Sequence, residues 1–219
     1  KEKNVLLSCH ASYFINLSSK EREKREASKK RIIDAAKRAY TCGAFSVCFH
    51  AGFYQGRTPA EIYEIIKAEL KDIVERLQQQ SIDIWIRPET TGRATQFGTL
   101  EEIIALSNEL EQIMPCIDFS HMHARSAGKL NSYEEFYNVL EILEKELGKK
   151  ALKEMHVHVS GIEYSDKGER YHLNLKGSDF KYKELLKALK EFNCKGVVIS
   201  ESPNIEEDAL LMKKCFEEL

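Results

Sequence analysis

The stretch DFSHMH, residues 118–123, follows a short apolar run at residues 114–117 that we interpret as a buried strand. Asp118 and His121 therefore leave the end of that strand close together, and both side chains are good metal ligands. Five other predicted strands have the same kind of ending, a charged or imidazole side chain at or just beyond the last apolar residues. Those side chains are His10, His50, Glu89, His158 and Glu201.

A buried strand has no favourable place for such a side chain unless that side chain is paired or ligates a metal. The six apolar runs lie at residues 5–9, 45–49, 82–86, 114–117, 155–159 and 197–200. When parallel strands end together, their carboxyl ends meet at one edge of the sheet. The pattern therefore predicts a single site at that edge.

Helical patterns separate the six strands. Three of them open on a capping box, at Thr58, Thr99 and Ser132, each with a glutamate three residues later. Further helices are expected over 19–40, ending near Gly43, and over 185–192 and 210–216, with the Ser132 helix stopping at Gly148. Alternation of this kind, without internal hairpin signals, indicates an α/β protein with a parallel sheet covered by helices.

A closed barrel of this type needs eight strands. Either two βα units are missing before Lys1, or the sheet is open. We expect one domain over residues 1–219 that is N-terminally incomplete. The connection at 161–180 is longer than the usual two to six residues or so, and we interpret it as a flap over the site because it contains Glu169, Arg170 and His172.

The composition predicts a cytoplasmic protein with no membrane segment. Charged residues make up 31% of the 219 residues and hydrophobic residues 42%, and neither a signal peptide nor a long apolar span is present. The six cysteines form no C-x-x-C pair, which favours reduced, buried thiols. With a formal net charge of -2, binding of nucleic acid would need a local basic patch.

The candidate ligands are nitrogen and oxygen donors without a thiolate, which suits zinc, manganese or iron. They outnumber the ligands of one ion, so two or three ions are expected. Clustered divalent ions can generate a hydroxide and stabilise a phosphoryl centre. Of the remaining histidines, we interpret His123 as a hydrogen-bonded structural residue or an outer support of the site, and His156 as inner packing. The candidates are His10, His50, Glu89, Asp118, His121, His158, His172 and Glu201.

At this point the motifs resemble a known family, the endonuclease IV apurinic/apyrimidinic endonucleases of the xylose-isomerase-like barrel superfamily. The segment at 10–17, HASYFINL, is similar to the family's H-x-S-Y-L-I-N-L. Residues 49–52, 89–92, 118–121 and 201–203 resemble F-H-P-G, E-N-T-A-G, D-T-C-H and the final E-T-x-x-P. His158 stands where the H-L-N-D histidine would be, so the resemblance runs in order from His10 to Glu201.

The resemblance implies a TIM-type (β/α) barrel without its first two βα units, three zinc ions, with manganese as an alternative metal, and cleavage of double-stranded DNA 5′ to abasic sites by a monomer. One ion would be held by His10, His50 and Glu89, a second by Glu89, Asp118, His158 and Glu201, and a third by His121 with His172 and Glu169. Glu89, Asp118 and Glu201 would be central to catalysis. Tyr13 and Phe14 would probe the DNA at the abasic nucleotide, although packing over the core is the structural alternative.

The flap departs from the family pattern, because Glu169-Arg170-Tyr171-His172 replaces D-R-H. Two other functions stay open. A sugar isomerase or epimerase of the superfamily would use Glu89, Asp118 and Glu201 without needing His10 and His50. A non-catalytic relative could still bind DNA. Whether the protein is an endonuclease or a non-catalytic DNA-binding relative, arginines in strand-end loops could contact phosphates. The alternative is that they are scattered surface charge. They are Arg57, Arg87, Arg93, Arg125 and Arg170.

Overall fold

The structure is a computed structural model that describes residues 5–219. The chain divides into two compact units. Unit 1 comprises Lys1–Glu89 and Thr95–Pro115, and unit 2 comprises Thr90–Ala94 and Cys116–Leu219. The expectation of one domain over the whole chain stays a prediction, and residues before Lys1 lie outside the described part. None of the described helices is long and apolar enough to cross a membrane.

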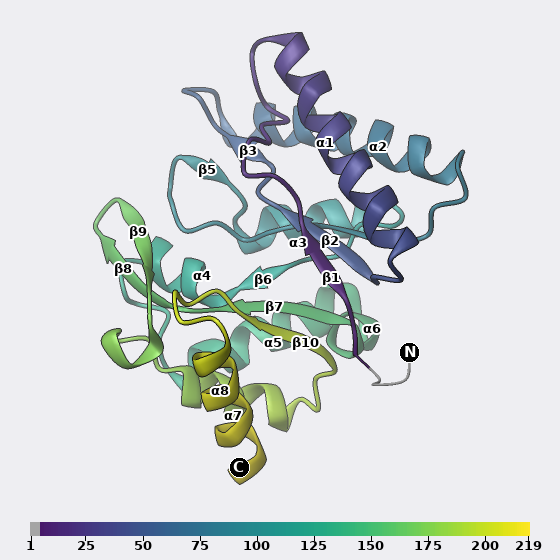
Figure 1. Ribbon diagram of the computed structural model, residues 1–219. Coiled ribbons are helices and arrows are strands. Elements are labelled where there is room, and N and C mark those ends of the chain that lie inside the picture. Colours follow the sequence, from purple (N-terminus) through teal and green to yellow (C-terminus); the bar gives the residue numbers. More distant parts are fainter. Residues whose placement is uncertain (1–4) are drawn as a thin grey trace. The chain divides into compact units, whose positions relative to one another are not determined.

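Unit 1 is built on a three-stranded parallel sheet in the order β1-β2-β4. Two long helices, α1 and α2, lie beside each other in Figure 1, and α1 packs on β1 and β2. A short antiparallel pair, β3 with β5, extends the loops beyond the strand ends. The elements are β1 (Ser8–His10), α1 (Arg22–Thr41), β2 (Ser46–Phe49), β3 (Gly52–Phe53), α2 (Pro59–Gln78), β4 (Trp85–Pro88), β5 (Gln96–Phe97) and α3 (Leu100–Glu109).

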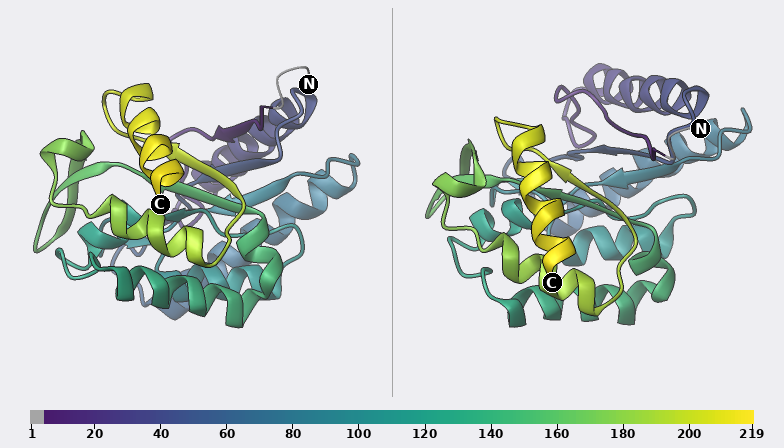
Figure 2. Two further views of the ribbon diagram at one scale, coloured as in Figure 1. Left: turned by 90° about the horizontal axis from the view of Figure 1, so that it is seen from below. Right: turned by 60° about the horizontal axis from the view of Figure 1, so that its bottom comes forward.

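Unit 2 is built on a second three-stranded parallel sheet in the order β10-β7-β6. Helices α7 and α8 run beside each other next to this sheet, as Figure 2 shows. An antiparallel hairpin, β8–β9, projects from the end of β7. The elements are β6 (Ile117–Asp118), α4 (Phe119–Arg125), α5 (Tyr133–Leu147), α6 (Lys149–Lys153), β7 (Met155–Val159), β8 (Gly161–Ser165), β9 (Gly168–Leu173), η1 (Leu175–Gly177), α7 (Tyr182–Glu191), β10 (Gly196–Ser200) and α8 (Glu206–Glu218).

The three capping boxes are confirmed. In each, the Thr or Ser side chain accepts from the amide of the glutamate three residues on, and that glutamate accepts from the cap amide. Helices α2, α3 and α5 therefore begin at the residue after Thr58, Thr99 and Ser132, as predicted. Each capping box supplies hydrogen-bond acceptors to backbone amides that the first helical turn leaves without partners.

The prediction of six parallel strands is confirmed, but the start of the first strand is wrong, and two elements were not predicted. The segment predicted as a long flap loop over 161–180 contains the β8–β9 hairpin, because tertiary pairing overrides a sequence without an apolar alternation. A helix, α4, starts immediately after β6, with Asp118 as its N-cap. The first strand spans Ser8–His10, whereas Val5 is 69% exposed and lies outside it.

The core of unit 1 forms where the apolar faces of its helices meet the sheet. Ile32 and Ala36 of α1, Ile66 and Ile73 of α2 and Val47 of β2 are all without exposed surface. Burying a valine or isoleucine side chain contributes roughly 1.5–3 kcal/mol. This core fixes the ends of β1, β2 and β4, where the polar residues of the site begin.

Candidate metal centres

The first cluster lies in unit 1 and consists of His10, His50 and Glu89. His10 ends β1, His50 follows β2, and Glu89 follows β4, so parallel pairing brings the three together. His10 Nε2 lies 3.2 Å from Glu89 Oε2, and His50 Nε2 lies 3.4 Å from Glu89 Oε1. Two imidazoles thus face the two oxygens of one carboxylate that is fully buried.

Hydrogen bonding orients His10 in this cluster. Its Nδ1–H donates to the Ala11 carbonyl at 2.6 Å, which turns Nε2 toward Glu89. Burial lowers the pKa of His10, but the hydrogen bond and charge of Glu89 outweigh it and raise the pKa to about 9. The electrostatic environment therefore attracts a cation, whether a proton or a metal ion, to this position.

The second cluster lies in unit 2 and consists of Asp118, His158 and Glu201, whose ligand atoms lie within 4.8 Å of one another. Asp118 and His158 are paired residues of β6 and β7, and Glu201 follows β10. His158 Nδ1 is 3.3 Å from Glu201 Oε1. Asp118 Oδ1 accepts from the His121 amide at 2.7 Å, while its buried Oδ2 accepts no hydrogen bond within the described residues.

The third cluster, also in unit 2, joins α4 to the hairpin. His121 Nε2 and His172 Nε2 are 3.3 Å apart, and the Glu169 carboxylate lies 3.7 Å from the first and 3.9 Å from the second. Each histidine points its other ring nitrogen at a backbone carbonyl, His121 at Thr90 and His172 at Glu201. The structure thus brings Glu169 near His121 and His172, but the carboxylate that groups with both histidines, with ligand atoms within 4.8 Å of one another, is that of Glu201. Metal ligation by any of these residues stays a prediction.

The third cluster fits a bound cation on chemical grounds. If both Nδ1–H groups donate to their carbonyls, the two neutral rings direct Nε2 lone pairs at each other across 3.3 Å. That arrangement is unfavourable unless a proton or a metal ion lies between them. Together with the carboxylate of Glu169, these are the nitrogen and oxygen donors that zinc and manganese accept in proteins.

The aromatic residues after β1 are on the surface. Tyr13 is 79% exposed and Phe14 is 82% exposed, so the alternative that they cap the core is wrong. The Tyr13 ring lies 5.1 Å from the His10 ring and 6.5 Å from the His50 ring. A flat, exposed side chain therefore stands directly beside the first cluster.

The five arginines predicted to contact phosphates differ in exposure and in hydrogen bonding. Arg93 and Arg170 are exposed, whereas Arg57 donates to the Ser18 carbonyl and is half-buried. Arg87 is fully buried and donates to the Pro115 carbonyl at 2.7 Å, so the idea that it contacts phosphate is wrong. Arg125 donates to Thr91 Oγ1 and to the Arg93 carbonyl, so its side chain holds the loop at residues 91–93.

Sequence reasoning missed Thr90. Its hydroxyl exchanges hydrogen bonds with the backbone of Asp118, and its carbonyl faces His121 Nδ1. The signal was its place directly after Glu89. His156 is buried as predicted, but its Nε2 lies 3.1 Å from His158 Nε2, so it supports a ligand as well as packing. His123 is a buried, hydrogen-bonded residue, as expected.

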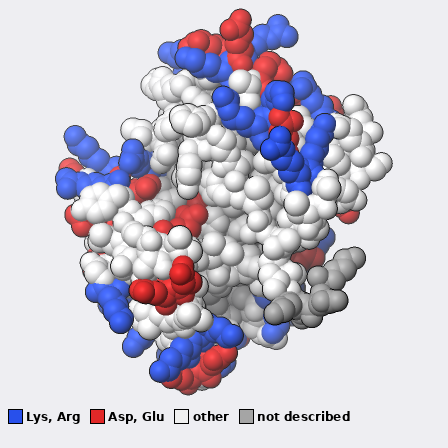
Figure 3. All heavy atoms as spheres, in the orientation of Figure 1, with Lys and Arg blue, Asp and Glu red and all other residues white. Residues whose placement is uncertain are grey.

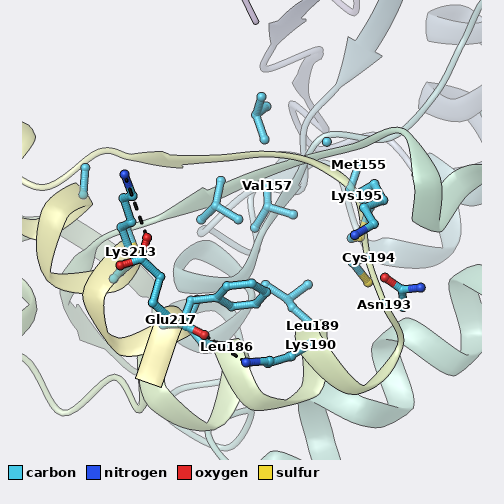
Figure 4. Close-up of a pocket in the computed structure, with 16 residues that line it drawn as sticks. Met155, Val157, Leu186, Leu189, Lys190, Asn193, Cys194, Lys195, Lys213 and Glu217 are labelled. Carbon is cyan, nitrogen blue, oxygen red and sulfur yellow. Dashed lines mark hydrogen bonds and ion pairs between the residues drawn. The ribbon is translucent and has the colours of Figure 1, made fainter. Parts of the chain in front are cut away.

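Unit 2 also contains an apolar cavity of about 700 Å³, drawn in Figure 4. It is lined by Met155 and Val157 of β7, Leu186 and Leu189 of α7, and residues of β10 and α8. Met155 and Gly196, which open β7 and β10, belong to its wall. The cavity thus lies at the amino ends of these strands and includes none of the candidate ligands.

Two curated relatives cover nearly all of the chain. An uncharacterised protein of Methanocaldococcus jannaschii is 48% identical over 216 residues, covering 99% of this chain and 78% of that protein. Apurinic-apyrimidinic endonuclease 1 of Plasmodium berghei is 28% identical over 227 residues. That match covers all of this chain but only 43% of the Plasmodium enzyme.

Solved structures give the fold. Endonuclease IV from Thermus thermophilus superposes with a TM-score of 0.74 at 21% identity, covering 97% of this chain and 76% of that one. A D-tagatose 3-epimerase-like protein gives 0.73 at 22% identity, covering 99% and 78%. The family model described as xylose isomerase-like TIM barrel matches residues 1–216. The chain therefore belongs to the xylose isomerase-like TIM barrel family.

Proposed function

We propose that the protein is a metal-dependent phosphodiesterase of the endonuclease IV type that cleaves double-stranded DNA 5′ to abasic sites, acting as a monomer. The observation that carries the proposal is the first cluster. Two histidines and a buried carboxylate converge there, beside an exposed tyrosine. A sugar isomerase of the superfamily has no need of that histidine pair.

Bound divalent ions would supply a hydroxide near neutral pH and stabilise charge on the phosphoryl oxygens. In the proposal, His10, His50 and Glu89 hold one ion, Asp118, His158 and Glu201 hold another, and His121, His172 and Glu169 hold a third. The resemblance also makes Glu89 a ligand of the second ion, and that assignment stays a prediction. Zinc is the proposed metal, with manganese as the alternative.

Substrate selection falls to the exposed side chains near the clusters. Tyr13 and Phe14 can fill the space left by a missing base and replace its stacking. Arg93 on the surface can neutralise a phosphate, which positions the duplex without reading its sequence. Arg57 contributes to a lesser degree, because its guanidinium already bonds the Ser18 carbonyl.

The second candidate is a sugar epimerase of the same family, favoured by the fold shared with the D-tagatose 3-epimerase-like protein. It would depend on Glu89, Asp118 and Glu201, and the cavity of Figure 4 does not help it, because no candidate ligand lines that cavity. A non-catalytic DNA-binding relative would retain Tyr13 and Phe14 but would cleave nothing.

The test loads the purified protein with zinc or manganese and assays two reactions in parallel. The substrates are a duplex with one stable abasic analogue and a ketohexose such as D-tagatose. We expect incision 5′ to the lesion, its loss in His10→Ala, and no epimerisation. Glu111→Gln, a change at an exposed glutamate, is the control and should cleave normally. Epimerisation that survives His10→Ala, with no incision, would overturn the proposal.

A further inference from the structure

The β8–β9 hairpin decides whether the third cluster forms, because it carries both Glu169 and His172 while His121 stands on α4. Near its turn, β9 is held through the backbone of Glu169. The Glu169 amide donates to the Gly92 carbonyl at 3.0 Å, and Arg93 Nε donates to the Glu169 carbonyl at 3.1 Å. Gly92 must remain glycine here, since an added Cβ would lie 2.6 Å from Glu169 Cβ.

At the same end, the β8 strand is held through Tyr164, the register partner of Glu169. The Tyr164 hydroxyl donates to Asp179 Oδ2 at 2.7 Å, and His123 Nε2 donates to Asp179 Oδ1 at 3.0 Å. His123 Nδ1 faces the Leu130 carbonyl at 3.1 Å. One carboxylate thus joins the hairpin to α4, two residues beyond His121.

The site around Tyr164 is shaped to receive that ring. The His123 ring packs edge-on against the Tyr164 ring, with centroids 4.9 Å apart. The Phe180 ring also packs against His123, with centroids 5.5 Å apart. Gly128 adopts a φ of +85° directly at the Tyr164 hydroxyl, where a side chain would collide with the oxygen. The Gly128 backbone, the His123 ring and the Asp179 carboxylate therefore all fit the same position of Tyr164 on β8.

We propose that Tyr164, Asp179 and His123 form a latch that positions the hairpin so that Glu169 and His172 meet His121. These are positioning residues: none is among the candidate ligands, and they set the affinity of the third cluster through the hairpin. The inference rests on the metal sites of the proposed function, but not on the reaction that those sites catalyse.

The test titrates metal-free full-length protein with Co²⁺ and follows the visible absorption of the bound ion. The third site is identified as the signal lost in His172→Ala, and the first as the signal lost in His10→Ala. In Tyr164→Phe, which removes one hydroxyl, we expect the affinity of the third site to fall about tenfold or more, the range for outer supports of a metal ligand. The affinity of the first site should not change.

Tyr171→Phe is the matched control, since it removes the same hydroxyl from a residue of the same hairpin that is 58% exposed. It should bind Co²⁺ as the wild type does. His123→Gln breaks the latch from the α4 side and should reproduce Tyr164→Phe. Equal third-site affinity in Tyr164→Phe and Tyr171→Phe, or no His172-dependent signal in the wild type, would overturn the latch. Failure of DNA incision with these affinities as expected would instead overturn only the proposed function.

Discussion

Three histidines of the candidate clusters share one orientation. His10, His121 and His172 each turn Nδ1 to a backbone carbonyl, at 2.6, 3.0 and 3.0 Å, and turn Nε2 to a carboxylate or a second imidazole. A backbone carbonyl fixes the tautomer of a ligand histidine and leaves its other nitrogen for the metal. His158 differs, since it faces Glu201 through Nδ1 and His156 through Nε2.

Glu89→Gln tests the first cluster by changing the carboxylate that both imidazoles face. The amide keeps the size of the carboxylate but removes the charge that two imidazoles face, so we expect loss of the first metal site. Loss of an outer support alone weakens metal sites about 10–100-fold, and a direct ligand should lie at or beyond the upper end. Co²⁺ titration and incision rates measure the loss, with Glu111→Gln as the control. A folded Glu89→Gln protein, by far-UV circular dichroism, that incises normally would contradict the assignment.

Tyr13→Ala tests the exposed aromatic residue. A side chain that replaces lost stacking contributes about 1–3 kcal/mol at a base-sized gap, so binding to abasic duplex should weaken by about 5- to 150-fold, and binding to intact duplex much less. Fluorescence anisotropy with both duplexes gives the two affinities. Tyr40→Ala alters another exposed tyrosine, on α1, and should change neither. Equal weakening on both duplexes would show that Tyr13 does not recognise the lesion.

At the scale of elements, a buried ion network joins α1 to α2 in unit 1. Lys29 is 5% exposed, and its Nζ lies 2.6 Å from Glu26, 2.8 Å from Glu69 and 2.7 Å from Asp72. Figure 3 shows basic and acidic side chains mixed over these helices. Burial would lower the pKa of Lys29, but its three carboxylate partners raise it, so the lysine stays charged.

Lys29→Met should leave these carboxylates facing one another. We expect a loss of about 2 kcal/mol at pH 7, between the values for exposed and for fully buried pairs. Burial raises the pKa of Asp72, but its hydrogen bonds from Lys29 and Arg76 lower it overall. A depressed carboxyl pKa stabilises the fold above its unfolded value and loses that effect as pH falls through the folded value. The difference between wild type and variant should therefore shrink as the solution is acidified below about pH 4.

Urea unfolding at pH 7 and at pH 3.5 measures both quantities. Lys30→Met is the control, because Lys30 pairs with Asp34 at the surface and its side chain is 75% exposed. It should change stability by no more than about 0.5–1 kcal/mol at either pH. Equal effects of the two substitutions would show that the Lys29 network does not stabilise the α1–α2 pair.

Elements with local signals were predictable from the sequence, and elements made by distant partners were not. Thr58, Thr99 and Ser132 marked their helices to the residue, because a capping box is complete within four residues. Helix α4 escaped because Asp118 reads equally well as a strand-end ligand, and it is both cap and candidate ligand. The β8–β9 hairpin escaped because Gly92, Arg93 and Asp179 hold it from outside its own sequence.

In the candidate site, too, features with a signal in the sequence pattern were predictable, and features made by distant partners were not. His10, His50 and Glu89 were placed together correctly because parallel strand ends must converge. Arg87 was misplaced because strand β4 runs through Pro88, two residues further than the apolar run 82–86. Its side chain is thereby inside the unit rather than in a loop. The Tyr164–Asp179 contact depends on a tertiary hydrogen bond that no spacing in the sequence predicts, and for Thr90 the sequence indicates only its place directly after Glu89, not its hydrogen bonds with Asp118.

At the scale of the whole molecule, both units contain a set of donors. The first cluster belongs to unit 1, and the second and third belong to unit 2. A metal ion that binds only the folded state stabilises it by RT ln(1 + [L]/Kd), about 2.7 kcal/mol at one hundred times the Kd. Since the buried or half-buried donors of each cluster are brought together only by folding, both units should gain.

Removal of metal should therefore lower the melting temperature. At about 2–4 °C per kcal/mol for a chain of this size, one site worth about 2.7 kcal/mol corresponds to roughly 5–10 °C. Differential scanning calorimetry of zinc-loaded protein and of protein treated with a chelator measures this shift. His10→Ala should remove the zinc-dependent part that belongs to unit 1, and His172→Ala a part that belongs to unit 2. Zinc that leaves the melting temperature of the wild type unchanged at saturation would contradict metal binding at both units, whatever activity the protein shows.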